Sequence, residues 1–97
     1  MEKRQYEAIY VLHPHLDEEG INTAIAKFED SVKNLGGEIE KTERQGRRKA
    51  AFQLKKSNDG YFVLSYFNLN PDKVIDLKQY CKLSEQMLRH FIARKVG

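Results

Sequence analysis

The apolar residues change their spacing along the chain in an order that leaves very few topologies open. Period-two stretches rich in β-branched and aromatic side chains predict strands at residues 4–12, 38–54, 61–69 and 87–95. Spacings of three and four predict a helix from Asp17, its N-cap, to Leu35, and a second helix that begins at residues 70–72. The order β-α-β-β-α-β predicts an α+β ferredoxin-like sandwich, in which two helices cover one face of a four-stranded antiparallel sheet of order 4-1-3-2. A chain of 97 residues has room for one core, so we expect a single domain over residues 1–97.

The second predicted strand cannot be regular. Ile39 at its start and Phe52 near its end are both expected to face inward, although odd and even positions of a regular strand face opposite ways. One extra residue resolves this conflict, and Gly46 is the position at which we expect a β-bulge. The pair Asp59-Gly60 then predicts a hairpin turn into the third strand.

No constellation of residues in the sequence predicts catalysis. His13 and His15 have no third ligand at a recognisable spacing, so we expect a solvated loop there and no metal site. Cys81 falls on the apolar stripe of the second helix, where a small core residue is expected rather than a nucleophile. The loop after the first strand lacks the glycine and the arginine that an acylphosphatase-like hydrolase of this fold needs. We therefore expect no enzyme activity, no cofactor and no small-molecule substrate.

The composition favours the cytosol. A single cysteine excludes an internal disulfide and suits a reducing compartment. The longest uncharged runs are about ten residues, short of the roughly 20 that span a bilayer, and no apolar signal segment follows the first residues. We expect a cytoplasmic protein that makes no membrane contact.

Basic residues gather in two parts of the chain, although the net charge is only +3. Residues 41–56 hold seven Lys or Arg and one acid, and a second basic group falls on the opposite predicted edge strand. Charges on an edge strand also block aggregation, but that role needs fewer of them and does not favour Arg, whose planar group matches phosphate. We predict contacts to an RNA backbone from Lys3, Arg4, Arg44, Arg47, Arg48, Lys49, Arg89, Arg94 and Lys95.

One face of the predicted sheet is left without helices, and period-two alternation assigns apolar side chains to it. An apolar patch on that face predicts a site for a protein partner. Base stacking is the alternative, but residues 59–66 lack several positions of the RNA-recognition pattern, so we favour a protein. The predicted partner-binding residues are Ile9, Val11, Phe62, Leu64, Tyr66 and Phe91.

Several short segments carry a likeness that covers nearly the whole chain. They are an opening Arg-x-Tyr-Glu (residues 4–7), a Pro-containing loop (11–14), a Gly-led strand entry (37–39), a glycine followed by basic residues (46–52), a Lys-to-Phe hairpin (56–62) and the last strand (84–95). In order and spacing they resemble the family of the sixth protein of the bacterial small ribosomal subunit. Gln53 stands where the family's L-A-Y-P-I segment has proline, and the chain ends at Gly97 without the C-terminal tail of many members.

The resemblance implies a non-catalytic ribosomal protein. Such a protein would bind the central domain of small-subunit ribosomal RNA as a heterodimer with the eighteenth small-subunit protein, without the contacts that a C-terminal tail makes. The residues alone leave a second hypothesis open, a ferredoxin-like protein-interaction or small-ligand-sensing domain that dimerises through its sheet. A sensor of that kind would change its melting temperature with a metabolite and show no salt-dependent RNA binding.

Overall fold

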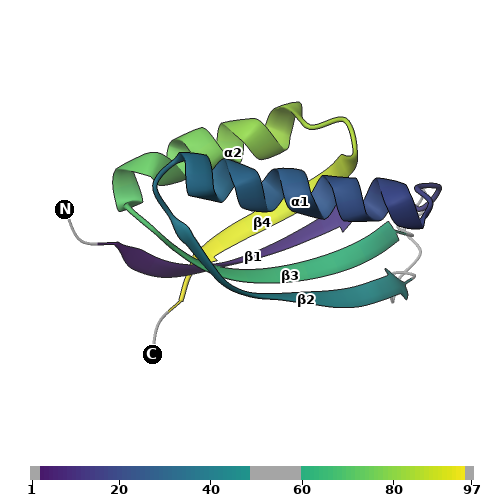
Figure 1. Ribbon diagram of the computed structural model, residues 1–97, viewed down its shortest axis with the longest axis horizontal. Coiled ribbons are helices and arrows are strands. Elements are labelled where there is room, and N and C mark those ends of the chain that lie inside the picture. The colour runs from purple at the N-terminus through teal and green to yellow at the C-terminus, as the bar shows by residue number, and fades with distance from the viewer. Residues whose placement is uncertain (1–2, 49–59, 96–97) are drawn as a thin grey trace.

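Two helices cover one face of a four-stranded antiparallel sheet (Figure 1). The computed structural model describes residues 3–48 and 60–95. The strands are β1 (Arg4–Leu12), β2 (Glu38–Arg48), β3 (Gly60–Leu69) and β4 (Met87–Arg94). The helices are α1 (Glu18–Asn34) and α2 (Val74–Leu83), and a single 3₁₀ turn (Pro71–Lys73) leads into α2. The predicted order of elements is confirmed.

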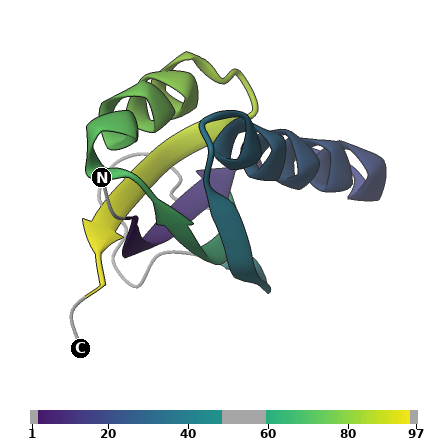
Figure 2. The same ribbon diagram turned by 60° about the vertical axis from the view of Figure 1, so that its left-hand side comes forward.

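The sheet has the strand order β2-β3-β1-β4, which is the predicted 4-1-3-2 order counted from the other edge. The central strand β1 pairs with β3 on one side and with β4 on the other. The strands β2 and β4 are therefore the two edges, so the basic residues that these two strands contain lie at opposite margins of the sheet. Figure 2 shows both helices on the same side of it.

The core lies between the helices and the face of the sheet formed by the even residues of β1. Tyr10 packs against Phe28 of α1, with 4.6 Å between ring centroids, and Phe28 meets Phe67 of β3 edge-on at 6.0 Å. All three rings are fully buried. Each of these rings removes a large apolar surface from water, so their burial contributes to the hydrophobic stabilisation of the domain together with the aliphatic core residues.

The first helix begins and ends where the sequence predicts. The Asp17 side chain accepts a hydrogen bond of 2.8 Å from the backbone N–H of Gly20, which satisfies one of the unpaired donors of the first turn. The helix ends before Leu35, and Gly36 follows with a φ of +88°, a conformation that costs glycine little.

Strand β2 contains two irregularities rather than the one predicted. Its register against β3 shifts between Arg44 and Gly46, and Gly46 has a φ of +91°, so the predicted bulge is confirmed. A second shift lies between Ile39 and Lys41. No glycine marks this second shift. Because two one-residue shifts restore the original alternation, the inward-facing residues alone do not reveal both of them. The predicted end of this strand and the predicted turn, residues 49–59, lie outside the described residues.

Candidate functional site

The register of the sheet brings the six predicted partner-binding residues onto the face away from the helices. Ile9 lies directly between Leu64 of β3 and Phe91 of β4, and Val11 lies opposite Phe62. Residues that are directly opposite each other in a sheet share a face. We call Ile9, Val11, Phe62, Leu64, Tyr66 and Phe91 the open-face patch.

The members of the open-face patch differ in exposure. The side chain of Phe91 is 66% exposed and that of Ile9 is 44% exposed, whereas Val11 is only 4% exposed. Phe62, Leu64 and Tyr66 are half-buried. The outermost ring of this apolar row is open to water, so the free energy falls when another protein covers the row. Val11 has little surface left to offer, so the exposed centre of the patch is the row of Leu64, Ile9 and Phe91.

Leu88 also belongs to this face, although the pattern of the sequence does not predict it there. The pairing of β1 with β4 shifts between Val11 and Leu12, which introduces an irregularity near Leu88. A Cβ atom built on Gly60 would clash with Val11 and lie 3.7 Å from the Leu88 side chain, so Leu88 approaches the same end of the open face. It is 43% exposed. Simple alternation along β4 assigns Leu88 to the helix side, because nothing in the sequence marks this irregularity.

A polar margin borders the patch along β2. The Lys41 ammonium lies 2.7 Å from the Glu43 carboxylate, and this contact raises the pKa of Lys41. The Glu40 carboxylate accepts hydrogen bonds from Asn68 at 2.8 Å and from Gln5 at 3.2 Å, which hold the pKa of Glu40 below its usual value. Because the Lys41–Glu43 pair carries no net charge, the negative charge beside the apolar row on this side comes from Glu40.

The predicted RNA-binding residues fall at the two ends of the sheet. Arg47 and Arg48 pair with the start of β3, and Arg89 lies opposite Val11 at the same end. At the other end Arg4 is opposite Leu69 and Arg94 is opposite Tyr6; Lys3 and Lys95 adjoin them in the chain. The eight residue steps of β1 separate the two ends by about 27 Å at the usual rise of a strand. Lys49 lies outside the described residues.

Among the predicted RNA-binding residues, Arg44 and Lys95 each contact a side chain of the domain. Arg44 pairs with Val63 in the ladder, on the helix side of the sheet, and its guanidinium lies 3.6 Å from the Glu18 carboxylate of α1. The Lys95 ammonium lies over the ring of Tyr66, 5.1 Å from its centroid. Lys95 thus borders the open-face patch as well as the basic end of the sheet.

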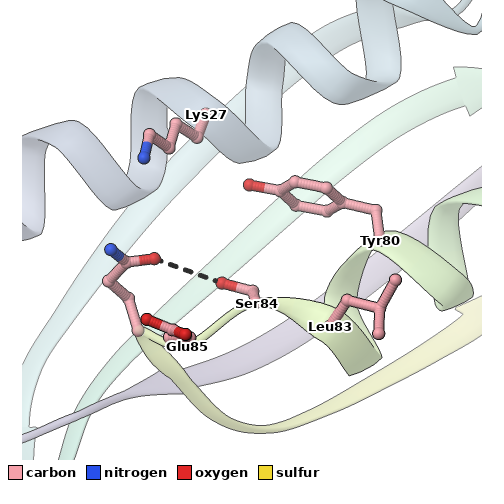
Figure 3. A pocket seen from close by; sticks show the side chains of 6 residues that line it. Lys27, Tyr80, Leu83, Ser84 and Glu85 are labelled. Atoms are coloured by element: carbon pink, nitrogen blue, oxygen red, sulfur yellow. Dashed lines mark hydrogen bonds between the residues drawn. The ribbon is translucent and has the colours of Figure 1, made fainter.

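A shallow pocket of about 400 Å³ lies between α1 and the turn from α2 to β4. Figure 3 shows Lys27 of α1 on one side of this pocket and Tyr80 and Ser84 on the other. The Ser84 hydroxyl and the Gln86 side chain are hydrogen-bonded to each other at 3.4 Å. No predicted site residue lines the pocket.

The residues considered for catalysis or metal binding do not assemble a reactive site. Burial raises the pKa of Cys81 to about 12, so its thiol is protonated and unreactive at neutral pH. The rings of His13 and His15 stack with 5.5 Å between centroids. Within residues 3–48 and 60–95, no three His, Cys, Asp or Glu side chains come together as metal ligands. In this part of the chain neither helix is both long and apolar enough to cross a membrane.

Comparison with known proteins gives one consistent result. The sequence model of a family described as ribosomal protein S6 matches residues 5–94. The small ribosomal subunit protein bS6 of Clostridium kluyveri is 39% identical over 90 residues, covering 93% of this chain and 95% of the relative. That of Carboxydothermus hydrogenoformans is 35% identical over 92 residues, covering 95% and 96%. A crystal structure of 30S ribosomal protein S6 from Thermotoga maritima superposes with a TM-score of 0.88 at 25% identity, covering 97% of this chain and 89% of the other.

Proposed function

Because the chain belongs to the ribosomal protein S6 family and is a component of the small ribosomal subunit, we propose that it binds the central domain of small-subunit ribosomal RNA together with the eighteenth small-subunit protein. Its relatives are structural proteins of the ribosome and not enzymes. As part of the ribosome it is cytoplasmic and associated with ribosomal RNA. In this proposal one surface binds the protein and others bind the RNA.

The observation that carries the proposal is the contrast between the open face and the ends of the sheet. The centre of the open face is apolar and uncovered, with Phe91 66% exposed and Ile9 44% exposed. Its margin along β2 carries the Glu40 carboxylate and the Lys41–Glu43 ion pair. Carboxylates repel phosphate, and burial of apolar side chains is most favourable against the apolar surface of another protein. These features favour a protein partner on the open face rather than RNA.

The RNA in this proposal contacts the two basic ends of the sheet. Arg47 and Arg48 end β2, and Arg89 lies at the same end of the sheet. Arg4, Arg94 and their neighbouring lysines supply the other end, about 27 Å away by the rise of β1. A separation of this size suits two backbone segments of a folded RNA rather than one. A single protein with two small basic clusters binds RNA weakly, and a heterodimer adds contacts without a second loss of freedom.

The test measures binding of the purified chain to a central-domain ribosomal RNA fragment over a salt series, with and without the eighteenth small-subunit protein. We expect tight binding only with the partner and a loss of affinity as salt rises. No binding in either condition, with the partner shown to be folded, would contradict the proposal. A shift in melting temperature with a metabolite would then favour the ligand-sensing alternative.

A charge-reversal pair locates the RNA contact. We expect Arg47→Glu with Arg48→Glu to weaken RNA binding by the heterodimer and to reduce the salt slope by roughly 0.7–0.9 for each phosphate that the protein no longer neutralises. The matched control is Lys78→Glu with Lys82→Glu, which changes the net charge equally on the exposed side of α2. Equal effects of the two pairs would show a nonspecific charge effect and would remove Arg47 and Arg48 from the proposed contact.

A further inference from the structure

Glu7 places a carboxylate beside the open-face patch, and the proposed function leaves it without a role. In the register of the sheet Glu7 lies between Tyr66 of β3 and Ala93 of β4, and Ile9 is the next residue on the same face. Glu7 is half-buried. Among residues 3–48 and 60–95, its side chain has neither a hydrogen-bond partner nor an ion-pair partner.

The lysines of the neighbouring positions are engaged elsewhere. Lys41 lies opposite Tyr66 on the far side from Glu7, and its ammonium contacts the Glu43 carboxylate at 2.7 Å. The ammonium of Lys95 lies over the Tyr66 ring, 5.1 Å from the centroid. Neither lysine comes within ion-pair distance of Glu7, so in the free protein this carboxylate depends on water.

Covering the open-face patch removes that water. A carboxylate transferred out of water without a new partner opposes binding strongly, whereas one that meets a cation or several donors does not. A partner with a purely apolar surface would therefore bind poorly beside Glu7. A partner that presents Arg or Lys next to its apolar residues would pair with Glu7 as Ile9 and Phe91 are covered.

We propose that Glu7 is a specificity-determining residue of the open-face patch, where it receives a Lys or Arg side chain of the docked protein. This inference rests on the proposed function, since it assumes that a protein occupies the patch. RNA on the same face would have the opposite dependence, because removal of the Glu7 charge would then strengthen binding.

The experiment compares Glu7→Gln with Glu85→Gln. Both variants remove one carboxylate and keep the side-chain size, so they change the net charge equally, but Glu85 lies in the turn that lines the helix-side pocket. The dissociation constant of each variant for the purified eighteenth small-subunit protein is measured by calorimetry, after circular dichroism and thermal melting show that both are folded. We expect Glu7→Gln to weaken binding about tenfold and to flatten its salt dependence, while Glu85→Gln stays within about twofold of the parent.

Phe91→Ala separates this inference from the proposed function. If Phe91→Ala weakens partner binding and Glu7→Gln does not, the role of Glu7 is wrong and the proposed protein interface stands. If neither variant affects binding of the partner, the open face is not the protein interface. The role of Glu7 and the placement of the partner on this face would then both be wrong. If Glu7→Gln instead increases the affinity of the isolated chain for the RNA fragment, the face binds RNA and the inference is overturned.

Discussion

The guanidinium of Arg44 lies 3.6 Å from the carboxylate of Glu18, which ties the β2 edge to the first turn of α1. Their side chains are 41% and 78% exposed, so water screens the pair and it contributes little to stability. The same contact turns Arg44 toward the helix layer, whereas Arg47 and Arg48 lie at the end of the strand. Arg44 is thus a different kind of residue from Arg47 and Arg48, although all three belong to one basic run.

Arg44→Gln tests this distinction. We expect the free energy of unfolding to change by less than about 1 kcal/mol, because an exposed ion pair is weak. We also expect the RNA affinity of the heterodimer to fall by less than about threefold, since one screened charge is removed and no predicted backbone contact at the strand end is touched. Chemical denaturation and RNA titration measure the two effects. A decrease as large as that of the single variant Arg48→Gln would place Arg44 in the RNA contact.

Phe91→Ala separates binding from stability. Because Phe91 is 66% exposed in the free chain, its truncation is expected to change the free energy of unfolding by less than about 1 kcal/mol. Affinity for the protein partner is expected to fall about tenfold or more, as for an exposed aromatic anchor that an interface buries. The matched control is Ile75→Ala on α2, which removes an apolar side chain that is 73% exposed on the helix layer. Phe91→Ala should weaken partner binding more than Ile75→Ala does. Equal effects would contradict the assignment of Phe91 to the protein interface.

Tyr10→Phe is expected to stabilise the domain. The Tyr10 hydroxyl is buried and has no hydrogen-bond partner among the described residues, and burial raises the pKa of Tyr10. Removing an unpaired buried hydroxyl recovers its desolvation cost, so we expect about 1 kcal/mol of added stability and a higher melting temperature. Tyr66→Phe on the open face is the control, with a change within about 0.5 kcal/mol. A clear decrease in stability for Tyr10→Phe would mean that the hydroxyl has a partner, such as a buried water.

The stability of the domain should fall in alkali because of Cys81. Burial raises the pKa of this thiol from 9.0 to about 12. The unfolded chain releases the proton near pH 9 while the folded chain keeps it, so the folded state binds more protons between these two values and loses stability as pH rises through them. Below pH 9 this contribution is complete.

Urea denaturation at pH 8 and at pH 10 measures the effect, which we expect to be about 1 kcal/mol for one thiol. Cys81→Ala removes the titrating group, so its stability should depend less on pH over the same interval, whatever its stability at pH 8. Tyr10 and Tyr80, whose pKa values burial also raises, add their own decrease in stability only from about pH 10 upward, where the unfolded chain releases their protons. Parallel pH dependences of the parent and Cys81→Ala would contradict the assignment to this thiol.

Local patterns of residues predict the elements and the faces of the central strand. The period of an apolar pattern depends on the geometry of one element, so β1 was predicted from residue 4 to residue 12, as observed. The same alternation placed Ile9 and Leu64 on one face, and the N-cap at Asp17 and the bulge at Gly46 followed from local chemistry. Each of these features needs only residues that are close in sequence.

Which residues meet depends on the packing of the whole fold. The position of Leu88 depends on an irregularity in the pairing of β1 with β4, and the contact of Arg44 with Glu18 depends on where α1 lies over β2. The burial of Val11 and the lack of a partner for Glu7 among the described residues likewise depend on side chains brought in by neighbouring strands. Pairing register and packing are relations between segments distant in sequence, and no local periodicity encodes them. The sequence therefore predicts the apolar face and the basic segments, whereas the contacts of their individual residues required the fold.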